Sequence, residues 1–198
     1  MILEIIPVCP FSRQTLLCCH EAGLSPILQK ADNIAKSDIF PILHTESEII
    51  TGENAIIYFL NYEYQLTLDY GHSSLGFINY CNRIFYKNIT ERCLLFKFGK
   101  LNIGNLYLWR EQLNEYLIQY QDLLQNHDYL LFDEYTIRDL VFASHVSILD
   151  YFGYIDWHCF NDLKLWYFRV KSRPSFMLLL QDWSERISPI ENYTKLDF

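Results

Sequence analysis

The order of the first predicted elements constrains the fold of this chain more than any other feature. Residues 3–8 form a short apolar run that predicts a strand, and apolar positions recur at helical spacing over residues 11–22. Gly23 stands where a helix often ends, and residues 25–31 alternate like a second strand. A strand–helix–strand unit predicts two parallel strands joined by a right-handed crossover.

Two more strands and a helix complete a small mixed sheet in the first third of the chain. Residues 40–43 and 48–50 predict strands joined by a polar turn, and residues 55–60 carry the apolar spacing of a helix. The order β-α-β, short link, β-β-α is that of a thioredoxin-like domain. We therefore place such a domain at residues 1–65 and a polar linker at residues 66–73.

Strand patterns fade from about residue 74, and long helical periodicities replace them. The best marked helix begins at Thr136, whose hydroxyl can cap it. The side chain of Asp139, three residues on, can in turn accept a hydrogen bond from the backbone N–H of Thr136. We expect an all-helical domain at residues 74–186, followed by a tail at residues 187–198. The predicted helices lie at roughly 74–98, 104–126, 136–152, 160–172 and 175–185.

Composition excludes several kinds of function. The 198 residues carry a formal net charge of −8, which does not favour binding to nucleic acid or to an anionic membrane surface. No apolar run approaches the roughly 20 residues of a membrane-spanning helix, and the N-terminus lacks the pattern of a signal peptide. Six cysteines without a CxxC pair suit free thiols in a reducing cytoplasm.

The histidines do not predict a metal site. None of the six pairs with another at the spacing of metal ligands, so we expect no bound metal. His145 lies on the well-capped helix, and we interpret it as a half-buried residue whose ring is hydrogen-bonded within the protein.

Four motifs resemble, in order and spacing, those of the cytosolic glutathione-transferase superfamily. They are Cys9-Pro10-Phe11-Ser12-Arg13, Phe40-Pro41-Ile42-Leu43, Gly52-Glu53-Asn54-Ala55-Ile56 and the Thr136–Asp139 capping box. The resemblance covers nearly the whole chain and implies a glutathione S-transferase-like fold: an α/β thioredoxin-like N-terminal domain and an all-α C-terminal domain. It also implies a homodimer, with glutathione as a possible co-substrate and no other cofactor.

The resemblance assigns a glutathione site to the thioredoxin-like domain. Phe40 would pair its backbone with the cysteinyl part of glutathione, and Pro41 would form the cis bond that this geometry requires. Glu53 and Asn54 would meet the γ-glutamyl end at a helix N-terminus, whose free N–H groups favour a carboxylate. Asn54 stands where serine is usual, which alters the pocket.

Cys9 and Ser12 are the candidate catalytic residues. Cys9 lies just before the first predicted helix, where a helix N-terminus can lower the pKa of a thiol and make it a nucleophile. Ser12, one turn further, could instead hydrogen-bond the thiolate of glutathione. The alternative is structural, with Cys9 as an unreactive, partly buried thiol and Ser12 as a residue of the first helical turn.

One departure from the superfamily argues against efficient use of glutathione. Only nine residues, 32–40, lead from the second predicted strand to the proline turn. Members of the superfamily usually have a longer segment here, and it contributes contacts to glutathione. The short link therefore implies a degenerate glutathione site, and whether the chain is a transferase stays open.

A narrower resemblance appears in the C-terminal third. Residues 147–157 and 166–176, and the end Tyr193-Thr194-Lys195-Leu196-Asp197-Phe198, resemble transferase-like cell-division proteins of alphaproteobacteria that bind FtsZ filaments. This resemblance implies a non-enzymatic or weakly enzymatic division factor in the cytoplasm or at the division site, with FtsZ or another division protein as partner. The runner-up is a glutathione-dependent transferase or thiol transferase that uses Cys9.

Two groups of residues are candidates for contact with such a partner. The first is a basic cluster that an acidic filament could meet, unless it is only a solvated helix face. It comprises Lys164, Arg169, Lys171 and Arg173. The second is the tail, a possible docking peptide that could alternatively pack back on its own domain. Its apolar residues are Tyr193, Leu196 and Phe198.

Overall fold

Two compact units make up the chain in the computed structural model, which describes residues 1–31, 40–66, 68, 72–130, 133–181 and 188–196. The sheet unit comprises Met1–Asp69 together with Arg173–Ser188. The helical unit comprises Tyr70–Ser172 together with Pro189–Phe198. The sequence placed the segment from Arg173 in the helical domain, whereas the structure groups it with the sheet.

The sheet unit contains the predicted four-stranded mixed sheet. Its strands are β1 (Ile2–Ile5), β2 (Ile27–Lys30), β3 (Ile42–His44) and β4 (Ile49–Thr51), in the order β2-β1-β3-β4. Strands β1 and β2 are parallel, and the other two pairs are antiparallel. The predicted strand–helix–strand unit is thereby confirmed.

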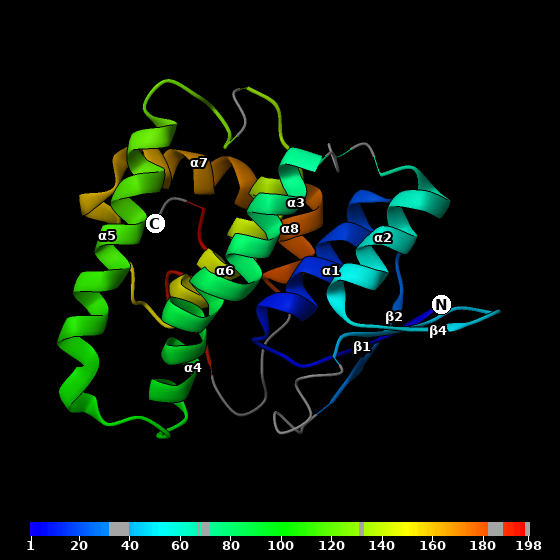
Figure 1. Ribbon diagram of the computed structural model, residues 1–198, viewed down its shortest axis with the longest axis horizontal. Helices are drawn as coiled ribbons and strands as arrows, with labels where there is room; N and C mark the ends of the chain where they lie inside the picture. Colours follow the sequence, from blue (N-terminus) through cyan, green and yellow to red (C-terminus); the bar gives the residue numbers. More distant parts are fainter. Residues whose placement is uncertain (32–39, 67, 69–71, 131–132, 182–187, 197–198) are drawn as a thin grey trace. The chain divides into compact units, whose positions relative to one another are not determined.

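Helices α1 (Pro10–Glu21) and α2 (Glu53–Tyr64) lie on the same face of this sheet (Figure 1), and α8 (Pro174–Leu179) packs against α1. The predicted helix end is confirmed at Gly23, whose φ of 73° lies in the left-handed region that glycine adopts without strain. There the N–H of Leu24 donates to the carbonyl of Cys19 at 2.8 Å, which satisfies one of the last carbonyls of α1.

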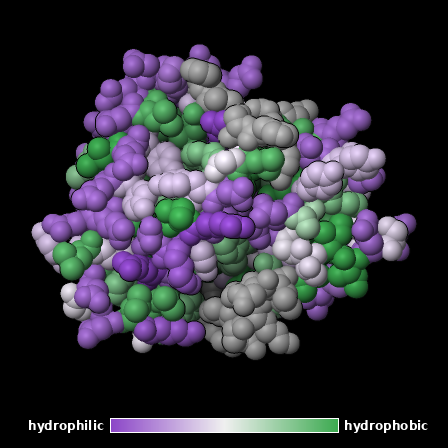
Figure 2. Space-filling model, viewed as in Figure 1, coloured by the Kyte–Doolittle hydropathy of each residue, from purple (hydrophilic) through white to green (hydrophobic). Residues whose placement is uncertain are grey.

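The two faces of the sheet differ in exposure. On the face that carries the core, Leu3 and Leu43 are neighbours across β1 and β3, and both are fully buried. On the other face Ile27, Ile2, His44 and Ile49 form a row across all four strands. Ile27 and Ile49 are 69% and 66% exposed. Figure 2 shows hydrophobic residues gathered over this part of the molecule.

The helical unit is built from long helices, as the periodicity predicted. A nearly continuous helical stretch contains α3 (His72–Asn79), η2 (Tyr80–Thr90) and α4 (Glu91–Lys97). It is followed by η3 (Ile103–Asn105), α5 (Leu106–Leu124), α6 (Ile137–Tyr151), η4 (Trp157–Cys159) and α7 (Asn161–Lys171). The η2 segment is a π-helix, which the sequence pattern did not predict. None of the described helices is long and apolar enough to cross a membrane.

Helix α6 forms the centre of the helical unit. The predicted capping box is present: Asp139 accepts from the backbone N–H of Thr136 at 2.9 Å, and the hydroxyl of Thr136 caps the helix. The second oxygen of Asp139 accepts from the N–H of Leu130 and from the indole of Trp166, both at 2.8 Å. The carboxylate therefore ties the helix start, the preceding loop and α7 together.

His145 lies deeper in α6 than the sequence indicated, with no exposed surface. Its Nε2 is 3.2 Å from Oδ1 of Asn82, and its Nδ1 is 3.0 Å from the hydroxyl of Thr90, both on η2. A neutral imidazole has one nitrogen that donates a hydrogen bond and one that accepts, and these two neutral partners satisfy both. Burial lowers the pKa of His145 to about 3.

Candidate functional site

The thioredoxin-like site begins at the loop that leads from β1 to α1. Cys9 is the N-cap residue of α1, and no side chain caps that helix. Its side chain is 8% exposed and packs in an apolar cluster with Ile6 and Phe40. Pro10 follows at the first helical position, where its missing N–H does not matter.

The surroundings of Cys9 favour the neutral thiol. Burial raises the pKa of Cys9, and the negative charge of Glu53 raises it further. Hydrogen bonds from Ser12 and from the backbone of Phe11 oppose this rise without reversing it. Because the thiolate is the nucleophilic form, this geometry disfavours catalysis by Cys9 and favours the alternative of an unreactive, buried thiol.

Ser12 has a structural hydrogen bond. Its side chain is 2% exposed, and its hydroxyl oxygen accepts from the backbone N–H of Ile6 at 3.1 Å. This bond links the start of α1 to the end of β1, so it holds the loop that carries Cys9. The structure thus gives Ser12 a role in shaping the loop, whereas its action on a thiolate remains a prediction.

The proline turn lies beside this loop. The bond between Phe40 and Pro41 is cis, and Phe40 contacts the cluster around Cys9. The carbonyl of Pro41 accepts from the N–H of Gly52 at 2.8 Å, which places the turn next to the start of α2. Gly52 has a φ of 85°, a conformation that a residue with a side chain adopts only with strain.

The predicted γ-glutamyl contacts lie at the start of α2. Glu53 is half-buried, Asn54 is exposed, and the amide of Asn54 donates to the carboxylate of Glu53 at 3.0 Å. The structure thus brings Cys9, Phe40 and Glu53 into one neighbourhood. The short link over residues 32–39 lies outside the described residues. Glutathione binding at this place remains a prediction.

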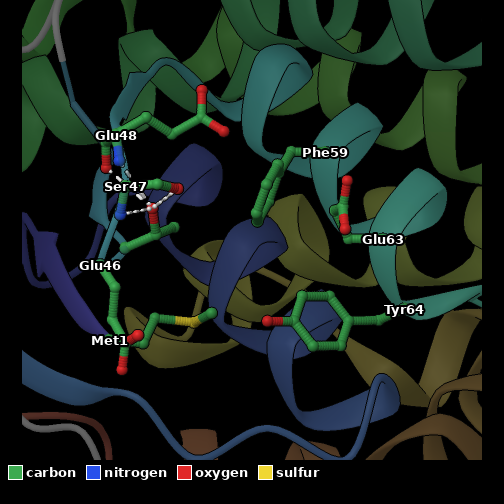
Figure 3. Close-up of a pocket in the computed structure, with 8 residues that line it drawn as sticks. Met1, Glu46, Ser47, Glu48, Phe59, Glu63 and Tyr64 are labelled. Atoms are coloured by element: carbon green, nitrogen blue, oxygen red, sulfur yellow. Dashed lines mark hydrogen bonds between the residues drawn. The ribbon is translucent and has the colours of Figure 1, made fainter.

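A cavity of about 370 Å³ occupies another part of the sheet unit (Figure 3). It lies between the β3–β4 turn and α2, with the hydroxyl of Tyr64 directed toward Met1. Glu46, Glu48 and Glu63 line it, and none of the predicted glutathione contacts does. Three carboxylates repel an anionic tripeptide, which disfavours glutathione in this cavity.

The basic cluster predicted from the sequence does not form a free cationic surface. Arg173 makes two parallel hydrogen bonds to Glu21, at 2.9 and 2.8 Å, and joins α8 to α1 inside the sheet unit. Arg169 pairs with Asp128 at 2.7 Å. Lys171 is fully buried, so its assignment to an exposed surface is wrong. Of the four residues, Lys164 is half-exposed, and its part in partner binding remains a prediction.

The tail packs back on the helical unit at Tyr193, while most of its other described residues are exposed. Tyr193 has no exposed surface, and its ring meets that of Tyr151 edge to face at 5.0 Å. The N–H of Ile190 donates to the carbonyl of Tyr151 at 3.1 Å. Tyr193 is therefore not available to a partner, contrary to its predicted role. Leu196 is half-exposed, and Phe198 lies outside the described residues.

Sequence reasoning missed the ion pair beneath the tail. Nζ of Lys171 lies 3.3 Å from Oδ2 of Asp150, and both side chains are almost completely inaccessible. Burial lowers the pKa of Lys171 and raises that of Asp150, and the charge of each partner opposes the shift of the other. The available signal was Asp150 itself, an acidic residue between apolar neighbours at the end of α6.

The described residues contain no group of three or more His, Cys, Asp or Glu side chains that could hold a metal ion. Five of the six cysteines, Cys9 among them, are buried free thiols, and Cys159 is exposed.

Comparison with known proteins gives one curated relative and many structures. No protein-family model matches this chain. The chain is 34% identical over 122 residues to FtsZ-localized protein A of Caulobacter vibrioides. The match spans 62% of this chain and about half, 53%, of that protein's length.

Solved structures match over the full length of this chain. FzlA from C. crescentus has a TM-score of 0.85 and a glutathione S-transferase from Rhodospirillum rubrum F11 a TM-score of 0.87. Both are 23% identical to this chain, and each match covers 100% of both proteins. Such scores agree with the four-stranded mixed sheet and the mostly helical remainder described above. The chain is therefore a glutathione S-transferase-like protein in fold, with a thioredoxin-like N-terminal part and an all-helical part.

Proposed function

We propose that this chain is a non-enzymatic or weakly enzymatic cell-division factor that binds FtsZ. The observation that carries the proposal is the 34% identity to FtsZ-localized protein A. The likeness in fold to FzlA over the whole chain supports it. By the same reasoning we place the protein in the cytoplasm, at the division site, and expect it to act as a homodimer.

The state of Cys9 supports a binding role over an enzymatic one. A thiol that is 8% exposed, with a raised pKa, is a poor nucleophile near neutral pH. Partner binding does not require a reactive thiol, because it depends on complementary surfaces. Leu196 is the tail residue that we favour for docking, since it is half-exposed whereas Tyr193 is buried.

Co-sedimentation with polymerised FtsZ tests the proposal. We expect the protein to pellet with filaments at micromolar concentrations and to stay in the supernatant when FtsZ is not polymerised. Leu196→Ala should reduce the pelleted fraction, whereas Leu165→Ala, an exposed apolar residue on α7, should not. No pelleting of the wild-type protein would refute the proposal.

A glutathione-dependent transferase or thiol transferase is the second candidate. The observation that favours it is the shared neighbourhood of Cys9, Phe40 and Glu53 beside the start of α2. Calorimetric titration with glutathione separates the two functions. Binding at millimolar concentration or tighter that is weakened by Glu53→Gln would favour the transferase, and a silent titration would count against it.

A further inference from the structure

One buried ammonium group holds both a core helix and the tail. Lys171 lies at the end of α7, and its side chain has no exposed surface. Its Nζ contacts Oδ2 of Asp150, at the end of α6, and donates to the backbone carbonyl of Lys195 at 3.0 Å. Lysine is almost never fully buried unless it is paired, so this arrangement needs a reason.

The ion pair and the tail depend on each other. Removing a charge from water costs several kcal/mol, which a buried pair offsets only when further hydrogen bonds satisfy its members. Asp150 obtains such a bond from the indole of Trp157 at 3.0 Å. Lys171 obtains one from the carbonyl of Lys195, which belongs to the tail. Displacing the tail would therefore take an acceptor from a buried cation.

Aromatic rings close the space around the ammonium group. Nζ of Lys171 lies 5.3 Å from the centre of the Tyr167 ring and 5.4 Å from that of Tyr193. Cation–π attraction is stronger where water is excluded, as it is here. Tyr193 thus covers Lys171 from the tail side, and Lys171 in turn stabilises the buried position of Tyr193.

This attachment lies among accessible residues of the tail, since Thr194 and Lys195 are exposed. Lys195 is the residue whose carbonyl is held, and the next residue, Leu196, is half-exposed. A fixed carbonyl one residue earlier restricts the direction in which the chain continues. Such ordering before binding lowers the entropy that a docking peptide loses when it meets its partner.

We propose that Lys171 is a positioning residue for partner binding: it holds the tail in the orientation in which Leu196 docks. This inference rests on the proposed function, because it concerns the same docking residue.

The test replaces the buried pair by neutral side chains of similar length. Lys171→Met combined with Asp150→Asn removes both charges, so that no carboxylate is left buried without its cation. The matched control is Lys87→Met combined with Glu91→Gln, which removes an ion pair from the helical unit at a more exposed place. Tyr193→Leu is a second variant, which keeps an apolar side chain but removes the aromatic cover.

Hydrogen exchange in the absence of partner reports on the tail. The N–H groups of Tyr193 and Lys195 donate to carbonyls within the tail, at 3.0 and 3.1 Å. Their exchange should accelerate about tenfold or more in the buried-pair variant, because local opening becomes easier, while α6 remains protected. Tyr193→Leu should act in the same direction, and the control should leave tail exchange unchanged. Equal tail exchange in the buried-pair variant and the control would overturn the proposal.

Affinity for polymerised FtsZ then separates positioning from general stability. The buried-pair variant should bind about tenfold more weakly, mainly through faster dissociation, and the control should bind like wild type. When Leu196→Ala is already present, the buried-pair change should have little further effect. A loss that persists in that background, or a loosened tail with unchanged affinity, would refute the positioning role. A wild-type protein that does not pellet refutes the proposed function and this inference with it, whatever the exchange shows.

Discussion

The buried histidine of α6 makes the stability of the protein depend on pH in a defined direction. The pKa of His145 is about 3 in the folded state, against about 6.5 in an unfolded chain. Between these values the unfolded state binds a proton that the folded state does not. Stability should therefore be complete above pH 6.5 and fall progressively as the pH is lowered toward 3.

The size of this effect follows from the two pKa values. At pH 5 protonation of this one ring raises the equilibrium constant of unfolding by a factor of about 30 relative to pH 8. This factor corresponds to a loss of about 2 kcal/mol in the free energy of unfolding. His20 acts in the same direction, because burial also lowers its pKa. A comparison between variants is therefore needed to isolate His145. The perturbation that we choose is His145→Gln, which keeps hydrogen-bonding groups but cannot titrate.

Urea unfolding at pH 8 and at pH 5 provides the assay. The loss of unfolding free energy between the two values should be about 2 kcal/mol smaller in His145→Gln than in the wild type. His158→Gln, at an exposed position, should leave the wild-type difference unchanged. Only the difference between pH values enters the comparison, so a lower overall stability of His145→Gln does not affect it.

Equal pH dependence in the wild type and His145→Gln would refute the reasoning. It would mean that the folded protein accepts the proton on His145, and hence that Asn82 and Thr90 can solvate an imidazolium. If His145→Gln does not fold, the ring resonances of His145 in the wild type decide instead. They should show no titration between pH 8 and pH 5.

Three further outcomes are expected. Asp139→Ala should lower the unfolding free energy by at least about 3 kcal/mol in urea titrations, since it leaves several buried N–H donors without their acceptor. Under native conditions a thiol reagent should modify the exposed Cys159 first, and the rate of this reaction should increase as the pH rises. Cys9 should react only when the protein unfolds. Rapid labelling that persists in the Cys159→Ser variant would contradict the burial of Cys9. Gly153→Ala should cost about 1–2 kcal/mol in thermal unfolding, because φ is 70° there and the new methyl group would lie 3.0 Å from Ile190; unchanged stability would contradict the backbone strain expected at this position.

Most of the fold could be predicted from local patterns. The strand–helix–strand order, the end of α1 at Gly23 and the capping box of α6 all depend on residues that lie close together in the chain. Periods of two and 3.6 residues and the turn preferences of glycine and proline are local properties, so they can be read without knowledge of distant contacts.

The candidate sites depended on contacts between distant residues. Glu21 and Arg173 are 152 positions apart, and their bidentate pair joins α8 to α1, which no local pattern indicates. A lysine among polar residues looked like a surface cation, and only its packing against Asp150 and the tail shows that it is buried. The periodicity of a helix tells which residues share a face, but it does not tell what covers that face. The charge state and accessibility of Cys9, Lys171 and Tyr193 were accordingly decided by the folded chain, because burial is set by neighbours that are remote in sequence.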